Sequence, residues 1–286
     1  MLSKIIIILT ILGIVFRFTT STEVHRIING NYASAKQLPY QVFFDKLDLS
    51  NLHVPLKWTP FCGGTIISEK TILTAAHCLD DPNIYAVKIY FGAVNILNET
   101  EVGQRRLVVK RDNFVVHEQY DKHLMANDIA LIKLPITLLF DDYIRAARLP
   151  NTIEQYKVSE ATVSGWGYVN VSPENNNFIP TSDPKLKYFN TLILSDEECQ
   201  LWTTKLGPTY SATLLCTAPG ENTACRGDSG GPLVVRHYSN FVLLGITSYN
   251  FGICESHYPT VYTKVTSYLY WIHDNSGGYI HAIPYA

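Results

Sequence analysis

The sequence predicts an all-β protein with a single helix near its C-terminus. Short runs rich in β-branched and aromatic residues recur along the chain, and turn residues close each run. Apolar residues at helical spacing occur only near the end, and the strands do not alternate with helical segments. Many short strands separated by turns are typical of a β-barrel or a β-sandwich.

The predicted strands follow one another from residue 40 to residue 265. In chain order they are "YQVFF" (40–44), "GTIIS" (64–68), "YAVKIYFG" (85–92), "RRLVVK" (105–110), "DIALIKL" (128–134), "ATVSGWG" (161–167), "GPLVV" (231–235), "FVLLGITSY" (241–249) and "PTVYTKV" (259–265). The stretches 46–60 and 169–184 are rich in Asn, Pro and Ser and are expected to be surface loops, where substrate contacts often lie.

The helix is expected at the end of the last strand. Val265, Tyr268, Leu269 and Ile272 fall at helical spacing, and the sequence "DNSGG" then ends the pattern. Since these residues are apolar, the helix should pack one face on the strands.

The N-terminus has the layout of a secretory signal peptide, which we place at residues 1–20. Lys4 precedes an apolar run from Ile5 to Phe16, and polar residues follow. The run is too short to span a bilayer comfortably, although a membrane anchor is the alternative. We therefore expect a secreted, extracellular protein. The net charge of −2 over 286 residues favours neither nucleic acid nor an anionic membrane surface as a partner.

Secretion changes the interpretation of the six cysteines. An even number in an extracellular chain indicates disulfides, and no pair has the Cys-x-x-Cys spacing of a zinc site. His117 and His123 do not form a metal motif either, so no metal and no cofactor is expected. The N-glycosylation sequons at Asn98 and Asn170 fit a secreted glycoprotein. We expect the protein to be a monomer.

Three short stretches together predict acyl-transfer chemistry. Ser229 lies in "TACRGDSGGP", His77 in "LTAAHC" and Asp128 in "NDIALIKL". A serine hydroxyl attacks a carbonyl only when a base takes its proton; histidine supplies that base, and a buried carboxylate orients the ring.

The order of these residues also separates two fold classes. An α/β-hydrolase shares the Gly-x-Ser-x-Gly motif, but its serine precedes its acid and its histidine. His237, His257, His273 or His281 could complete that order. The strand-rich pattern lacks the alternating helices which that fold needs, so this alternative is disfavoured.

The segments "IINGNYA", "FCGGTII", "LTAAHC", "NDIALIKL", "SGWG" and "GDSGGP" resemble the signature segments of trypsin-like (chymotrypsin-family) serine proteases, in the same order. The resemblance runs from Ile27 to the C-terminal helix. It implies two six-stranded antiparallel β-barrels with the active site in the cleft between them. It also implies that Ser229 is the nucleophile, His77 the general base and Asp128 the orienting acid, with the N–H groups of Gly227 and Ser229 as the oxyanion hole.

The resemblance further implies activation by proteolysis. A propeptide of residues 21–26 would be cut after Arg26, and the protease domain would then comprise residues 27–286. The new ammonium group of Ile27 is expected to pair with Asp228 inside the protein and to order the oxyanion hole. The implied disulfides are Cys62–Cys78, Cys199–Cys216 and Cys225–Cys254.

By the same matching, Thr223 lies at the base of the specificity pocket, and Asn250 and Thr260 form its walls. Since a neutral threonine cannot stabilise a buried cation, cleavage after Arg or Lys is disfavoured. The two wall residues add bulk, so we expect a shallow pocket for small or medium apolar residues, as in elastases. The alternative is a chymotrypsin-like preference for Phe, Tyr or Leu.

Three neighbours of the pocket have expected roles. Ser248 should support the buried aspartate, Tyr249 should provide an aromatic wall, and Arg226 should lie at the pocket rim or in solvent. Because a neutral pocket should not cut after Arg26, a separate trypsin-like activator is predicted.

The predicted function is that of a secreted serine endopeptidase acting on proteins or peptides and subject to protein inhibitors. A non-catalytic homologue that only binds is the alternative from another class.

Overall fold

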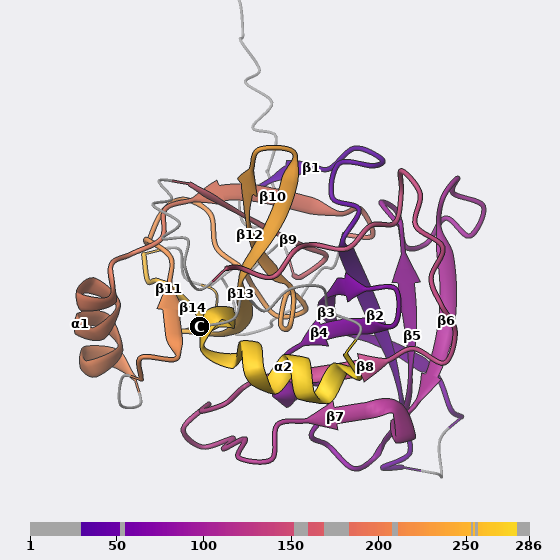
Figure 1. Ribbon diagram of the computed structural model, residues 1–286, viewed down its shortest axis with the longest axis horizontal. Helices are drawn as coiled ribbons and strands as arrows, with labels where there is room; N and C mark the ends of the chain where they lie inside the picture. Colours follow the sequence, from indigo (N-terminus) through magenta and orange to yellow (C-terminus); the bar gives the residue numbers. More distant parts are fainter. Residues whose placement is uncertain are drawn as a thin grey trace, which may run out of the picture.

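The computed structural model describes residues 30–51, 55–151, 160–168, 183–207, 211–252, 254 and 257–278, and these form two curled antiparallel sheets. Figure 1 shows the two sheets side by side, with the sheet built from the first half of the chain on the right. Within the described residues, no helix is long and apolar enough to cross a membrane.

The first sheet contains seven labelled strands in the order β6-β5-β2-β3-β4-β8-β7. They are β2 (Gln41–Asp48), β3 (Trp58–Ser68), β4 (Thr71–Thr74), β5 (Ile84–Phe91), β6 (Arg105–Lys110), β7 (Phe114–Val116) and β8 (Ala130–Lys133). The two edge strands, β6 and β7, are joined directly by the short 3-10 turn η2 (Arg111–Asn113). The sheet is therefore a barrel of six strands in which one strand bends to pair at both edges.

The second sheet has the order β1-β10-β9-β12-β13-β14-β11. Its strands are β1 (Asn31–Tyr32), β9 (Ala161–Gly165), β10 (Lys187–Thr191), β11 (Leu214–Cys216), β12 (Pro232–His237), β13 (Asn240–Asn250) and β14 (Thr260–Lys264). An antiparallel bridge between Ile193 and Thr217 joins the chain just after β10 to the chain just after β11, which closes six of these strands. The predicted pair of six-stranded antiparallel barrels is thus confirmed, and β1 is a short addition.

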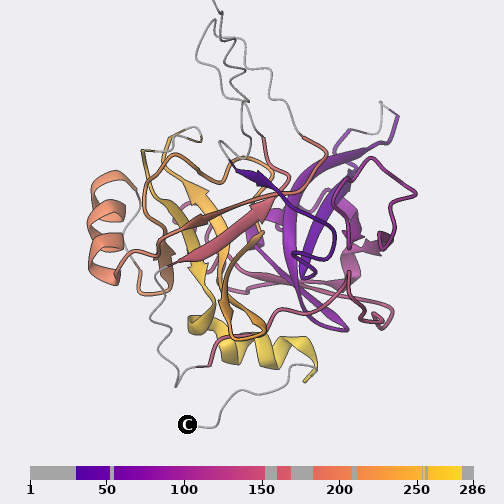
Figure 2. The same ribbon diagram turned by 90° about the horizontal axis from the view of Figure 1, so that it is seen from above.

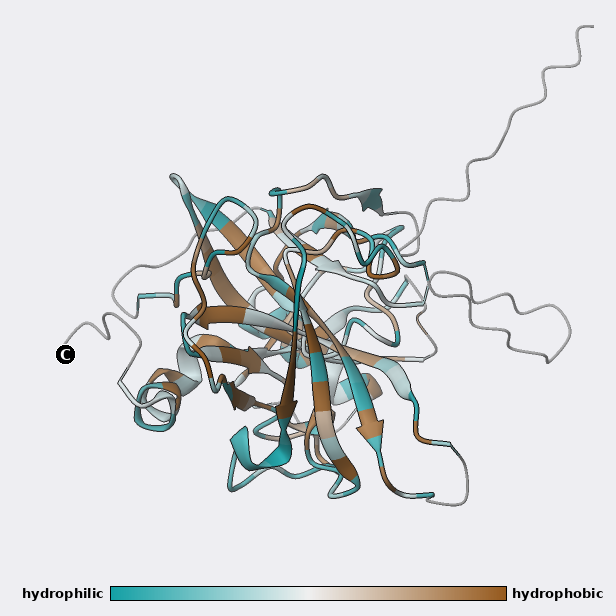
Figure 3. Ribbon diagram, turned by 90° about the vertical axis from the view of Figure 1, so that its right-hand side faces the viewer, coloured by the Kyte–Doolittle hydropathy of each residue, from teal (hydrophilic) through white to brown (hydrophobic). Residues whose placement is uncertain are grey.

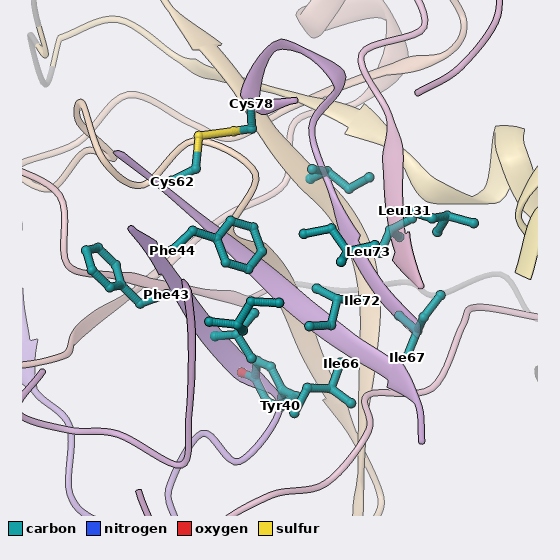
Figure 4. Close-up of a cluster of buried hydrophobic side chains, with 14 of the residues drawn as sticks. Tyr40, Phe43, Phe44, Cys62, Ile66, Ile67, Ile72, Leu73, Cys78 and Leu131 are labelled. Atoms are coloured by element: carbon teal, nitrogen blue, oxygen red, sulfur yellow. A yellow bond between two sulfur atoms is a disulfide. The ribbon is translucent and has the colours of Figure 1, made fainter. Parts of the chain in front are cut away.

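Apolar side chains fill the interior of the first barrel (Figure 4). Tyr40, Phe44, Ile66 and Ile72 are fully buried there, close to the disulfide between Cys62 and Cys78. Hydrophobic and hydrophilic segments alternate along the strands that face the viewer in Figure 3, as expected where one face of a strand is buried and the other is solvated. Burial of one such side chain stabilises the fold by about 1.5–3 kcal/mol.

The C-terminal helix packs as the sequence predicts. The turn η3 (Val265–Tyr268) leads into α2 (Leu269–Ser276), and the four predicted apolar residues are at most 5% exposed. η3 contacts β13 of the second barrel, while α2 contacts β8 of the first (Figures 1 and 2). Gly277 ends the helix in the left-handed conformation, with φ of 78°, where glycine carries little strain. The helix therefore joins the two barrels.

The expectation of a single helix is wrong. Asp196–Leu206 forms the helix α1, which begins with a capping box: Ser195 Oγ accepts a hydrogen bond from the Glu198 N–H, and the Glu198 carboxylate accepts one from the Ser195 N–H. The sequence "SDEE" contains this Ser-x-x-Glu signal. The helix exposes most of its surface and buries only Cys199 and Thr203, so no apolar stripe marks it in the sequence.

All three disulfides implied by the resemblance are present: Cys62–Cys78, Cys199–Cys216 and Cys225–Cys254. The described residues contain no free cysteine. The second bridge fixes α1 to β11, and each bridge closes a loop of 16 to 29 residues. Cross-links of this span stabilise a fold by about 3 kcal/mol in the chain-entropy model.

The barrel core gives a first prediction. Ile72 is 0% exposed, so Ile72→Ala leaves a cavity and should lower the free energy of unfolding by about 2–5 kcal/mol. Ile136 is 49% exposed, and Ile136→Ala should change it by less than about 0.5 kcal/mol. Urea unfolding followed by tryptophan fluorescence measures both, and equal losses in the two variants would contradict this assignment of the core.

Candidate active site

The turn that carries Ser229 is held between the two barrels. The Gly63 N–H on β3 donates a hydrogen bond to the Ser229 carbonyl at 2.8 Å, and the Gly230 N–H donates to the Thr247 carbonyl on β13 at 2.8 Å. Gly230 has φ of +74°, and a Cβ there would lie 2.1 Å from Thr74 Oγ1. Glycine is therefore required at position 230, and the turn lies against the segment that leads to the histidine.

His77 lies in the 3-10 turn η1 (Ala76–Cys78), directly after β4. The disulfide from Cys78 to Cys62 fixes this turn to β3, one residue from the contact between Gly63 and Ser229. The side chain of His77 is 24% exposed. The side chain is thus partly accessible to solvent, while the disulfide holds the backbone of the turn in place.

Asp128 receives hydrogen bonds from both barrels. Its side chain is 0% exposed, and Oδ2 lies 2.8 Å from His77 Nδ1 while Oδ1 accepts the His77 N–H at 2.9 Å. From the second barrel, Ser248 Oγ on β13 donates to Oδ2 at 2.6 Å, as the resemblance implies. Thr263 Oγ1 on β14 donates to the Asp128 carbonyl at 2.8 Å.

These contacts shift the pKa of both groups. Burial disfavours the Asp128 carboxylate, yet the charge of His77 and the hydrogen bonds from His77 and Ser248 hold the pKa of Asp128 below its usual value. Burial also disfavours the protonated ring of His77, but the charge of Asp128 and their hydrogen bond raise the pKa of His77 above its ordinary value. Asp128 is therefore the charged partner of His77 Nδ1, and His77 Nε2 remains available to exchange a proton.

Within the described residues, no hydrogen bond joins Ser229 Oγ to the His77 ring. The backbone contacts nevertheless keep Ser229 beside the turns that hold His77 and Asp128. Hydrogen bonds between a nucleophile and its base often tighten only when substrate binds. The structure thus brings together the elements that carry all three residues.

The backbone beside Ser229 presents free N–H groups. Gly227 has φ of +99°, which favours glycine, and the Asp228 N–H donates to the Cys225 carbonyl at 2.9 Å. Among the described residues, neither the Gly227 N–H nor the Ser229 N–H has a hydrogen-bond partner. Two such N–H groups, on either side of the buried Asp228, can donate hydrogen bonds to the negative oxygen of an acyl-transfer intermediate.

Asp228 is a second buried carboxylate, 1% exposed. It accepts hydrogen bonds from the Gly167 N–H at 2.8 Å and the Cys225 N–H at 2.9 Å. Burial raises the pKa of Asp228 to about 6, although these two bonds oppose the shift. A Cβ at Gly165 or Gly167 would lie within 2.4 Å of a carboxylate oxygen, so the glycines of "SGWG" make room for it. Arg26 and Ile27, the predicted cleavage site and ion-pair partner, lie outside the described residues.

The three predicted pocket residues lie together. Thr223 Oγ1 and Thr260 Oγ1 are 3.3 Å apart, and Asn250 pairs with Thr260 across β13 and β14. Asn250 Nδ2 donates to the carbonyl of Ala224, the residue after Thr223, at 2.7 Å. Thr223 and Thr260 are almost fully buried, at 2% and 3% exposed.

The neighbours of the pocket are also placed. Arg226 is exposed, and its carbonyl accepts a hydrogen bond from the Tyr168 N–H at 2.7 Å. The Tyr249 ring packs edge-on against Phe251, with ring centroids 5.7 Å apart.

The described residues offer one cluster with metal-ligand character, formed by Cys62, His77 and Cys78. The two cysteines are joined in a disulfide, so neither can supply the thiolate that a metal needs. His117 stacks on Trp271 at 5.0 Å between ring centroids, which is a packing role.

Asn98 is exposed, and its side-chain oxygen accepts hydrogen bonds from Thr100 N and Thr100 Oγ1 at 3.2 and 3.0 Å. Asn170 lies outside the described residues.

Two residues of the site were not found from the sequence. Thr263 donates to the Asp128 carbonyl, and Thr74 Oγ1 donates to the Gly63 carbonyl at 2.8 Å, which fixes β3 beside the turn of Ser229. Both are threonines in strands, where threonine is common. No local signal separates them from structural threonines, because their partners lie far away in the sequence.

The chain was compared with known proteins. A family model described as "Trypsin" matches residues 27–272. The chain is 34% identical to Trypsin alpha of Drosophila melanogaster over 247 residues, which is 86% of each chain. It is also 34% identical to Chymotrypsin of Phaedon cochleariae over 253 residues, which is 87% of this chain and 82% of that protein.

The packing around Asp228 gives a second prediction. Gly165→Ala places a methyl group 2.1 Å from Asp228 Oδ1, so the variant should lose about 1–3 kcal/mol in the free energy of unfolding. A Cβ added at Gly220 would meet no atom within 4 Å, so Gly220→Ala is the matched control and should stay within about 0.5 kcal/mol of the original chain. Chemical denaturation measures both variants. If Gly165→Ala unfolds with the same free energy as the original chain, the close packing of Gly165 against Asp228 is refuted.

Proposed function

The chain belongs to the trypsin family of serine proteases and is a serine endopeptidase, and on that premise we propose that Ser229, His77 and Asp128 are its catalytic triad. The observation that carries this assignment is the hydrogen bond from His77 Nδ1 to the fully buried Asp128 at 2.8 Å, beside the turn that holds Ser229. A histidine fixed in this way can act as a base near neutral pH.

The proposed mechanism is the one known from the type enzyme of this family. Ser229 Oγ attacks the scissile carbonyl while His77 Nε2 takes its proton, and Asp128 stabilises the imidazolium that forms. His77 then gives the proton to the leaving amine, and an acyl group remains on Ser229. Water then attacks the acyl group on Ser229 while His77 takes a proton from it. His77 returns this proton to Ser229 Oγ, and the carboxylic acid product is released.

We assign the Gly227 and Ser229 N–H groups to the oxyanion hole. Their lack of partners among the described residues supports this, because both can donate to the negative oxygen of the tetrahedral intermediate. Loss of one such donor typically costs roughly 100- to 1000-fold in turnover.

The chain is proposed to be a zymogen that is cut after Arg26. The burial of Asp228 supports this: its pKa of about 6 reflects a site that disfavours the charge, and a new ammonium at Ile27 would remove that penalty. A buried ion pair between the Ile27 ammonium and Asp228 would hold the turn 227–229 in its active form. The residues before Ile27 are proposed to be a signal peptide (1–20) and a short propeptide (21–26), and the disulfides fit a secreted protein.

For specificity we propose cleavage after small or medium apolar residues. Thr223 at the base has no charge to pair with Arg or Lys, although several relatives are named trypsins. Asn250 and Thr260 narrow the space above it. The alternative is a preference for Phe, Tyr or Leu, which needs the Asn250 side chain to move aside.

Partners follow from this assignment. Protein and peptide substrates come with the family. A separate trypsin-like activator, protein inhibitors and N-glycosylation at Asn98 and Asn170 are proposed. A non-catalytic binding homologue is the competing function, and the intact triad argues against it.

Labelling by a fluorophosphonate, which reacts with activated serines, tests the triad and the zymogen. The purified chain should label weakly until a trypsin-like protease cuts after Arg26, because only then does the Ile27 ammonium pair with Asp228. Cut Ser229→Ala should not label, and Arg26→Gln treated with the same protease should label as weakly as the uncut chain. Absence of label on the correctly cut chain would favour the binding homologue, and rapid self-activation would contradict the neutral pocket.

The pH dependence tests Asp128. Activity needs a neutral His77, and since its pKa is raised, kcat/KM of the cut enzyme should fall with decreasing pH through a midpoint above the ordinary histidine value. Asp128→Asn removes the negative charge that raises the pKa of His77, while burial still lowers that pKa. The midpoint of the pH profile should therefore move to lower pH. The kcat of this variant should drop about 10⁴-fold, the loss known for this change in the type enzyme of the family.

Asp142→Asn is the control for this profile. Asp142 is 61% exposed and pairs with Lys36 at the surface, so its replacement should leave the profile unchanged. If the low-pH midpoint of Asp128→Asn equals that of the original enzyme, the assignment of Asp128 as the partner of His77 is contradicted.

A further inference from the structure

The side chain of Asn250 reaches from β13 to the segment that carries Thr223, the residue assigned to the base of the specificity pocket. Asn250 ends β13, where it pairs with Thr260 of β14, and its amide Nδ2 reaches the Ala224 carbonyl at 2.7 Å. Ala224 directly follows Thr223, and Thr223 Oγ1 lies 3.3 Å from Thr260 Oγ1. The amide group thus bridges the wall formed by β13 and the wall formed by 223–224.

The hydrogen bonds in this pocket can be counted. The Ala224 carbonyl accepts from Asn250 Nδ2 at 2.7 Å and from Thr223 Oγ1 at 3.2 Å, which uses both of its lone pairs. Thr223 Oγ1 and Thr260 Oγ1 also contact each other at 3.3 Å, and either hydroxyl can be the donor in this contact. Among the described residues, neither of these two hydroxyls donates to Asn250.

The acceptor of the Asn250 amide remains without a partner. Asn250 Oδ1 is buried and has no hydrogen bond to the described residues. Its identity is fixed by chemistry, because a flipped amide would place an oxygen 2.7 Å from the Ala224 oxygen, where two acceptors repel. Buried acceptors without partners are uncommon in native proteins, and one beside a binding site gains a hydrogen bond when a ligand donates.

We infer that Asn250 determines specificity in two ways: its bridge to Ala224 keeps the pocket shallow, and its free Oδ1 favours a short hydroxyl side chain, threonine or serine, before the scissile bond. The inference rests on the proposed function and narrows its substrate class. Threonine and valine have nearly the same shape, but only threonine brings a donor to Oδ1. A longer side chain meets the bridge before it reaches the pocket base.

Peptide amides that differ only in the residue before the scissile bond test this on the cut enzyme. We expect kcat/KM for the threonine substrate to exceed that for valine by about 3- to 10-fold, the range of one net hydrogen bond. Serine should likewise exceed alanine, and phenylalanine should be cleaved more slowly than any of them.

Two variants separate the roles of the amide. Asn250→Val removes the acceptor and the amide bridge but keeps bulk at the strand end, so the threonine advantage should vanish. Asn250→Gly removes the acceptor, the bridge and the bulk, so phenylalanine should gain at least about 10-fold relative to alanine. Asn240→Val makes the same change at the other end of β13, about 30 Å away, and should leave all ratios unchanged. Thermal unfolding checks that each variant is folded.

The outcomes distinguish the two levels of the proposal. If the original enzyme cleaves the valine substrate as efficiently as the threonine substrate, and alanine as efficiently as serine, the role of Oδ1 is refuted and the proposed function stands. If Asn250→Gly does not improve phenylalanine, the bridge is not the barrier. Efficient cleavage after arginine, or no cleavage of any member of the panel, would instead refute the proposed specificity or activity.

Discussion

The arrangement of the active site depends on the hydrogen bonds to one buried carboxylate. Asp128 lies just before β8 of the first barrel, and its carboxylate holds the His77 turn. From the second barrel, Ser248 donates to this carboxylate and Thr263 donates to the Asp128 backbone carbonyl. A buried charge is costly unless donors surround it, so the two barrels are required to meet at this point. The junction of the two barrels therefore reflects the electrostatics of Asp128 as well as the packing of two sheets.

The second buried carboxylate shows the opposite balance. Asp128 has a histidine and a serine as donors, and its pKa is lowered; Asp228 has only two backbone N–H groups among the described residues, and its pKa is raised to about 6. The difference in charge partners separates a carboxylate whose ionised form is favoured from one that would be stabilised by a new cation. In the proposed enzyme the first serves every catalytic cycle, while the second responds once, to cleavage after Arg26.

Much of the fold could be predicted because its signals are local. Short strand runs such as "RRLVVK" appear as strands with the expected bounds, and the apolar residues at helical spacing are buried in η3 and α2. They are Val265, Tyr268, Leu269 and Ile272. α1 was missed because its signal is a capping box without an apolar stripe. Barrel closure could not be predicted from local pattern, since it depends on the bend at Arg111–Asn113 and on the bridge between Ile193 and Thr217.

The sequence by itself determined the residue types that acyl transfer needs, their chain order, the neutral Thr223 at the expected base of the pocket, and the three cysteine pairs implied by the family. Only the tertiary structure decided that Thr263 supports Asp128, that the glycines of "SGWG" make room for Asp228, and that the Asn250 amide crosses to Ala224 with one oxygen left free. The reason is distance along the chain: Thr263 and Asp128 are 135 residues apart, and a contact between such residues leaves no periodic trace in the sequence.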